Sequence, residues 1–73
     1  MTAPSPEAFE HAKRLFLEGL AHFDAARLPE ARTCFEQSLR WLPGRPSTLT
    51  NLAGTHIRLG EPMAALPLLQ QVL

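Results

Sequence analysis

The chain has 73 residues, 45% of them hydrophobic and 19% charged, which predicts one small globular domain over residues 1–73 and leaves no room for a second. Seven basic side chains balance seven acidic ones, and no apolar run approaches the ~20 residues that span a bilayer, so neither nucleic acid nor a membrane is an expected partner. The only cysteine, Cys34, has no intramolecular partner, and the first six residues lack the segments of a signal peptide, so we expect a reducing compartment, the cytoplasm.

The first predicted helix runs from about Pro6 to Ala25. Ser5 is placed to accept a hydrogen bond from a free amide of the first turn, and Pro6 suits the first helical position, where a missing N–H costs nothing. Further along, apolar residues recur at spacings of three and four, as they do on one face of a helix. These residues are Phe9, Ala12, Leu15, Phe16, Gly19, Leu20 and Phe23.

The second predicted helix begins at Pro29, after a short turn, and ends before the two prolines and the glycine of residues 43–46. Glycine supplies the left-handed conformation on which helices often end, and proline cannot continue a helix. The buried face of this helix is expected to hold Ala31, Phe35, Leu39 and Leu42.

Two more helices are predicted in the second half of the chain. The third begins near Pro46 or Ser47 and ends at Gly60, and the fourth begins at Pro62 and continues to the end. The fourth helix is apolar on nearly every side, a pattern typical of a helix that is buried on both faces. Pro67 lies inside it and removes a backbone hydrogen bond, so we expect a kink or a loosened helix there.

The pattern of large, small and aromatic residues in the first half returns 34 residues later. A repeat of this length is typical of helix-turn-helix units that cannot bury their apolar faces alone and therefore stack on one another. The first unit covers about residues 12–45 and the second about residues 46–73. The matching pairs are Leu15 and Leu49, Gly19 and Ala53, His22 and His56, Phe23 and Ile57, Ala31 and Ala65, Phe35 and Leu69, and Leu39 and Leu73.

Four residues of the first unit make the chain resemble the tetratricopeptide repeat family. That family has a small residue midway along the first helix, an alanine early in the second, an aromatic residue four positions later, and a proline that ends the unit. Here these are Gly19, Ala31, Phe35 and Pro43. The resemblance implies an all-α fold of two stacked helix-turn-helix repeats, in which four antiparallel helices form a segment of a right-handed α-solenoid.

The small residues mark the places where two helices of one repeat approach most closely. Neighbouring helices lie ~8 to 10 Å apart, and the closest crossings leave no space for a side chain larger than that of alanine. Gly19 with Ala31 supplies such a crossing in the first repeat, and Ala53 with Ala65 supplies it in the second. Phe35 and Leu69 are expected to fill the space beside these pairs.

The resemblance also implies a non-catalytic protein–protein interaction module. Arrays of this family line the inner wall of their superhelix with the first helix of each repeat, and they bind a peptide or a helix there. The corresponding residues in this chain are Lys13, Phe16, Leu17, Leu20, Ala21 and Asp24 in the first repeat, and Thr50, Asn51, Gly54 and Arg58 in the second.

Two of these residues depart from the subgroup of the family that binds a carboxylate. Phe16 and Leu20 stand where that subgroup carries lysine and asparagine, although Asn51 matches an asparagine that some members use to hold a peptide. The departure favours an apolar ligand such as an amphipathic helix. Alternatively, Phe16 and Leu20 pack inside this small domain or against a neighbouring subunit.

A second hypothesis is homo-oligomerisation, or docking of this chain as the N-terminal segment of a larger protein with the same repeats. Two units fall short of the three that repeat arrays usually need, and no polar capping helix follows the second unit. An uncovered fourth helix would expose an apolar face, which two copies could hide by forming a homodimer about a two-fold axis. The expected interface residues are Met63, Leu66, Leu69, Val72 and Leu73.

The sequence offers no support for catalysis, a cofactor or a metal site. Zinc sites usually contain local pairs of ligands such as C-x-x-C, and the three histidines and Cys34 form none. His22 and His56 are therefore expected to be packed, each with one ring nitrogen hydrogen-bonded. No base or cationic cluster lies beside Cys34 in the sequence, so we expect a buried thiol and not a nucleophile.

Overall fold

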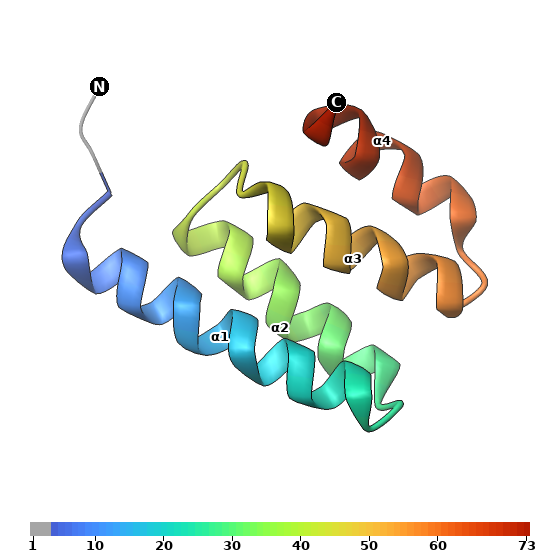
Figure 1. The fold of residues 1–73 in the computed structure, drawn as a ribbon, viewed down its shortest axis with the longest axis horizontal. Helices are drawn as coiled ribbons and strands as arrows, with labels where there is room; N and C mark the ends of the chain where they lie inside the picture. Colours follow the sequence, from blue (N-terminus) through green and yellow to red (C-terminus); the bar gives the residue numbers. More distant parts are fainter. Residues whose placement is uncertain (1–3) are drawn as a thin grey trace.

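The computed structural model describes residues 4–73. Residues 1–3, which belong to the stretch in which the sequence predicts no signal peptide, lie outside the described part. The helices of this part are α1 (Pro6–Asp24), α2 (Leu28–Trp41), α3 (Pro46–Arg58) and α4 (Pro62–Val72). Consecutive helices run antiparallel and pack as neighbours in chain order (Figure 1). The predicted all-α fold of two helical hairpins is confirmed, and the helix ends lie close to the predicted ones.

Each helix begins where the sequence places a proline. Pro6, Pro46 and Pro62 occupy the first position of their helices, and Pro29 occupies the second position of α2. At α1 the backbone N–H of Ala8 donates to Ser5 Oγ over 3.0 Å, which confirms the predicted cap. Proline suits these positions because the first turn of a helix leaves backbone N–H groups without a helical acceptor.

The turns inside the two hairpins are the same structure, separated by 34 residues. At the end of α1, the Arg27 N–H donates to the His22 carbonyl over 2.9 Å; at the end of α3, the Glu61 N–H donates to the His56 carbonyl over 2.8 Å. This bond closes a helix end when one residue adopts a left-handed conformation. The sequence repeat is therefore also a repeat of the backbone.

The core forms where α2 lies between α1 and α3. Ala31 and Phe35 of α2 are fully buried with Leu52 of α3. A Cβ atom placed on Gly19 of α1 would lie 2.6 Å from the Phe35 ring, so the close approach of α1 to α2 requires glycine at this position. Larger side chains pack around this cluster while remaining partly exposed, namely Phe16, Leu20, Phe23, Leu39 and Leu68.

The last helix differs from its prediction in how much of it is buried. Of its residues only Ala65 is buried, and Met63 is 75% exposed, so the expectation of a helix buried on both faces is wrong. The physical reason is that α3 is its main neighbour in the described chain, and the outer face of α4 has no helix against it. The helix continues through Pro67 to Val72, and the kink or loosening expected at this proline stays a prediction.

Candidate functional site

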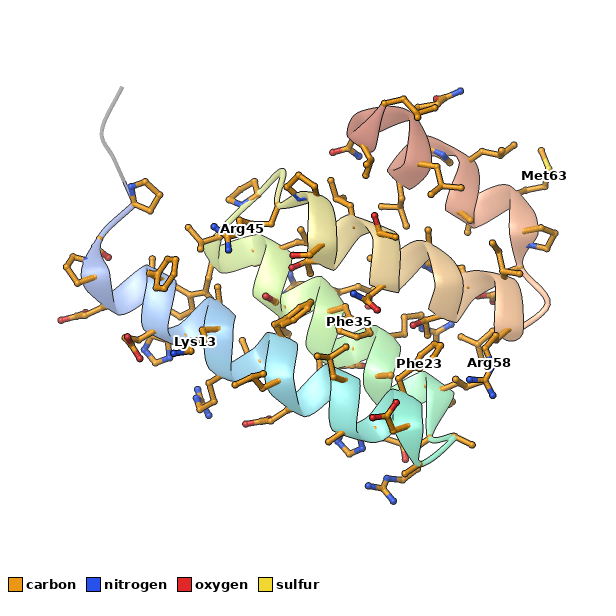
Figure 2. All side chains as sticks on the ribbon, viewed as in Figure 1. Lys13, Phe23, Phe35, Arg45, Arg58 and Met63 are labelled. Carbon is orange, nitrogen blue, oxygen red and sulfur yellow. The ribbon has the colours of Figure 1, made fainter. Side chains whose placement is uncertain are left out.

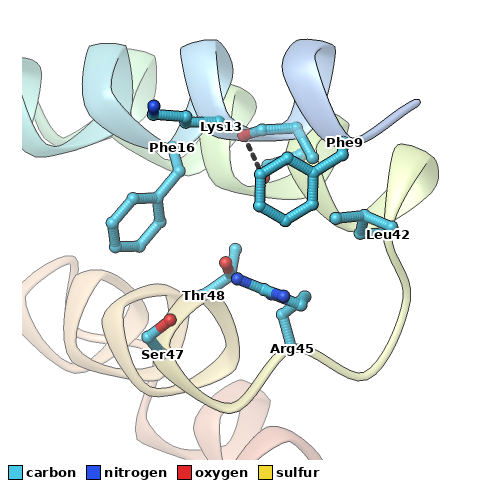
Figure 3. A pocket seen from close by; sticks show the side chains of 9 residues that line it. Phe9, Lys13, Phe16, Leu42, Arg45, Ser47 and Thr48 are labelled. Carbon is cyan, nitrogen blue, oxygen red and sulfur yellow. Dashed lines mark hydrogen bonds between the residues drawn. The ribbon is translucent and has the colours of Figure 1, made fainter. Parts of the chain in front are cut away.

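A small recess opens on the face of the molecule where α1 and α3 lie on either side of α2. It has a volume of about 100 Å³. Figure 3 shows α1 side chains on one wall and side chains at the start of α3 on the other. The lining residues are Phe9, Ala12, Lys13 and Phe16 from α1, Ser38 from α2, Leu42, Arg45, and Ser47 and Thr48 from α3.

The α1 wall of the recess is aromatic. Phe9 is 44% exposed, although it is one of the largest apolar side chains of the chain. Phe16 is half-buried, and its ring centroid lies 5.9 Å from that of Phe35 at an interplanar angle of 52°, a favourable tilted arrangement. The core therefore fixes Phe16 from behind, and Phe9 extends the aromatic surface toward solvent.

The opposite wall and the floor are polar. The Ser38 hydroxyl donates to the Ala12 carbonyl over 2.8 Å and ties α2 to α1 beneath the recess. Thr48, at the start of α3, lines the recess and is only 3% exposed.

Two arginines of the α3 segment lie over phenylalanines of α1. The Arg45 guanidinium carbon is 5.5 Å from the centre of the Phe9 ring, and that of Arg58 is 4.8 Å from the centre of the Phe23 ring. A cation over an aromatic face is attracted by the negative charge density of the ring. These contacts connect the two hairpins across both ends of the α1–α3 face.

The structure brings only some of the predicted inner-wall residues together. Lys13 and Phe16 line the recess, and Leu20 packs against the core, as the alternative interpretation of that residue expected. Arg58 lies over Phe23, at the far end of the same face. Asp24 is exposed at the end of α1.

Other predicted residues lie elsewhere or are already engaged. Leu17, which is 53% exposed, lies with Ala21 on the outer flank of α1, away from the recess. The Asn51 side-chain amide donates to the Ser47 carbonyl of its own helix over 2.8 Å. Thr50 is exposed and Gly54 is half-buried.

The predicted interface residues of α4 vary in exposure. Met63 and Leu66 are exposed, the latter by 48%, and Val72 and the terminal Leu73 are exposed as well. Leu69, which matches Phe35 in the sequence repeat, is half-buried.

The histidines and the cysteine are occupied by packing contacts. The ring nitrogen Nδ1 of His22 accepts from Arg27 Nε over 3.0 Å, and that of His56 lies 2.9 Å from Glu61 Oε1, so the predicted hydrogen bonds are confirmed. Burial, and to a lesser extent the charge of Glu18, raises the pKa of the half-buried Cys34 thiol, which makes it a poorer nucleophile. Within residues 4–73, no three His, Cys, Asp or Glu side chains lie close enough together to hold a metal ion.

Sequence reasoning missed several residues of the recess. Phe9 was assigned to the apolar face of α1, but its spacing of seven from Phe16, and again from Phe23, is a signal that all three rings share one stripe. Arg45 lies in the segment 43–46, which was interpreted as the stop of the second helix, and it was otherwise counted among the scattered basic residues. Ser38 and Thr48 carried no signal, because a buried hydroxyl cannot be distinguished from an exposed one by sequence spacing.

Comparison of the chain with known protein families, curated proteins and solved structures found no match. None of the helices within residues 4–73 combines the length and the apolar character needed to cross a membrane.

Proposed function

We propose that this chain is a non-catalytic protein–protein interaction module of the tetratricopeptide type, which binds a peptide segment on the face between α1 and α3. The observation that carries this proposal is the open recess, with the exposed Phe9 on one wall and the exposed Ser47 beside the buried Thr48 on the other. Binding sites combine apolar lining with a few polar groups in this way, since the first supplies affinity and the second fixes orientation.

The repeated backbone supports the family assignment. The identical turns at His22–Arg27 and His56–Glu61, 34 residues apart, are what two stacked repeats of one family require. The close contact of Gly19 with Phe35 agrees with the small residue and the aromatic residue that carried the resemblance. We also propose a cytoplasmic location, where the single unpaired Cys34 would remain reduced.

The size of the recess favours an extended ligand over a helix. A recess of about 100 Å³ has room for one side chain, whereas an amphipathic helix binds through several side chains spaced along its apolar face. An extended segment inserts single side chains on one side, and one apolar side chain suits the space between Phe9 and Phe16. This revises the amphipathic helix that the sequence favoured.

A display selection with short random peptides tests the proposal. Peptides that bind the native protein should bind Phe9→Ser about tenfold more weakly, because the substitution removes one aromatic wall. Leu17→Ser is the matched control, since Leu17 is a similarly exposed apolar residue of α1 outside the recess. Enriched peptides that tolerate Phe9→Ser but lose binding to Leu17→Ser would place the site elsewhere and overturn the proposal.

A second candidate function is self-association through α4. The observation in its favour is the exposed apolar face that includes Met63 and Leu66. Sedimentation velocity over a concentration series should then show a dimer that Leu66→Ser dissociates. A monomer at every concentration would contradict self-association and leave the α1–α3 face as the only proposed interaction site.

A further inference from the structure

The two arginine–phenylalanine pairs mark the two ends of the α1–α3 face. Arg45 precedes the first residue of α3 and Arg58 is its last, while Phe9 and Phe23 lie near the two ends of α1. Figure 2 shows Arg45 and Arg58 at opposite ends of α3. A row that begins with one pair and ends with the other therefore follows the α1–α3 face, with the recess at its Phe9 and Arg45 end.

These cations have no acidic partner within residues 4–73. The ion pairs of that part of the chain join Arg14 to Glu18, and Arg32 and His56 to Glu61. Arg45, Arg58 and Lys13 belong to none of them, and no acidic side chain lines the recess. The recess end of this face is therefore cationic although the whole chain is neutral, whereas the exposed Asp24 follows Phe23 at the Arg58 end.

Stacking on phenylalanine leaves the guanidinium groups able to bind a carboxylate. The aromatic ring contacts the flat face of guanidinium, whereas its N–H donors point outward in the plane. Two of these N–H groups can donate in parallel to the two oxygens of one carboxylate. Each pair therefore holds a cation in place on an apolar support and presents it to an incoming acid.

The separation of the pairs sets the length of the ligand. Helix α3 has 13 residues and, at ~1.5 Å per residue, is about 20 Å long. An extended peptide advances ~3.3 Å per residue, so about six residues cover the same distance. Between the pairs lie the aromatic wall of Phe16 and the half-buried Leu20, which suit apolar side chains.

We propose that the partner is an extended peptide segment with acidic side chains at two positions about six residues apart and apolar side chains between them. Arg45 over Phe9 binds one acid and Arg58 over Phe23 binds the other. An apolar side chain next to the first acid enters the recess. This inference rests on the proposed peptide-binding function and specifies the chemistry of its ligand.

A biased peptide library tests the inference directly. Its members have blocked ends, random apolar centres, and either glutamate or lysine at two positions about six residues apart. Selection on the native protein should enrich glutamate at both positions. Arg45→Glu should reverse the preference at one position and Arg58→Glu at the other, each with a roughly fivefold loss of affinity for the doubly acidic peptides. Arg40→Glu, on the exposed side of α2 away from the recess, is the control and should leave the preference unchanged.

The outcomes separate this inference from the function on which it rests. Enriched peptides that depend on Phe9 but show no preference for glutamate would overturn the acidic ligand. They would still support peptide binding at the recess. If Arg40→Glu weakens the preference for glutamate as strongly as Arg45→Glu does, the preference reflects net charge alone. This result would also overturn the acidic ligand. If no peptide is enriched from either library, both the proposed peptide binding on the α1–α3 face and the proposed acidic ligand are contradicted. A circular dichroism melt of each variant shows that it is folded.

Discussion

The two hairpins share one backbone plan and fill it with different side chains. In α1–α2, Gly19 allows the fully buried Phe35 ring to lie against the neighbouring helix. In α3–α4, the equivalent positions hold Ala53 and Leu69, and the leucine is only half-buried. In the second hairpin the small residue is larger (alanine for glycine) and its partner is smaller (leucine for phenylalanine). The two residues at the crossing therefore divide the available volume differently, and the helices still cross in the same way.

The hairpins also differ in their surroundings. Helix α2 packs against both α1 and α3, whereas α4 has α3 as its main neighbour and exposes Met63 and Leu66. Burial on two sides lets α2 carry the core, and burial on one side leaves α4 with little more than Ala65 buried. The comparison shows that the position of a repeat in the stack, as well as its sequence, determines how much of it is buried.

The largest effect is expected where the hairpins differ most, at Gly19. Gly19→Ala places a methyl group 2.6 Å from the Phe35 ring, which is fully buried and cannot move away. Overpacking of this kind costs ~1 to 3 kcal/mol, partly offset by the ~1 kcal/mol better helix propensity of alanine. The net loss in the free energy of unfolding should therefore reach up to about 2 kcal/mol, as measured by urea denaturation.

A double variant tests whether the pairing in the second hairpin can replace that in the first. Gly19→Ala combined with Phe35→Leu reproduces the Ala53 and Leu69 pair, so the leucine should relieve the clash. The two changes should then be less destabilising together than the sum of their separate effects, by about 1 kcal/mol. Strict additivity would show that the residues at this crossing do not compensate one another.

A second difference is the buried hydrogen bond that only the first hairpin contains. The Ser38 hydroxyl donates to the Ala12 carbonyl of α1, while the equivalent residue of α4, Val72, lies at the surface. Ser38→Ala should therefore lower the free energy of unfolding by about 1 kcal/mol. Val72→Ala serves as the comparison and should change it less, since Val72 is exposed and its side chain makes no hydrogen bond. Equal losses in the two variants would show that the Ser38 bond contributes nothing measurable.

The turns provide a third comparison, because they have the same conformation but different residues. Gly60 has a φ angle of 79° and Ala26 one of 62°, a left-handed conformation that costs residues with a Cβ atom about 1 kcal/mol. Ala26→Gly should stabilise the chain by about 0.5 to 1 kcal/mol, and Gly60→Ala should destabilise it by a similar amount. Thermal melts of both variants test this, and changes of the same sign would contradict the equivalence of the turns.

Most of the fold could be predicted from the sequence because its signals are local. Prolines mark the helix starts, Gly60 and the residues around Pro43 mark two of the ends, and the pattern of Gly19 and Phe35 recurs in the second unit. The burial of α4 could not be predicted in this way. Apolar composition shows that a face can be buried, but only the arrangement of the other helices shows whether anything covers it.

The candidate site could be predicted only in part. Lys13 and Phe16 were found, because they lie on a helix face whose periodicity is clear. Arg45 lies in an irregular segment, where spacing does not predict the direction of a side chain, and Thr48 depends on the angle between α1 and α3. Contacts of this kind join residues far apart in the chain, and a single sequence carries no periodic signal for them.

The smallest effect concerns the turn of the second hairpin, which alone contains a titrating carboxylate. The hydrogen bond from His56 and, after it, the positive charge of Arg32 lower the pKa of Glu61 from its ordinary value of 4.5. A lowered pKa in the folded state means that the ionised carboxylate stabilises the fold at pH above about 4.5, and that this stabilisation is lost as the pH falls through the folded pKa. Glu61→Gln should therefore melt slightly below the native chain near pH 7, and the difference should disappear in acid.

Arg27→Gln, at the matching position of the first hairpin, changes no carboxylate, so its melting difference should not follow this pH dependence. A Glu61→Gln difference that stayed constant down to about pH 3 would show that the Arg32–Glu61–His56 contact does not link the two hairpins energetically.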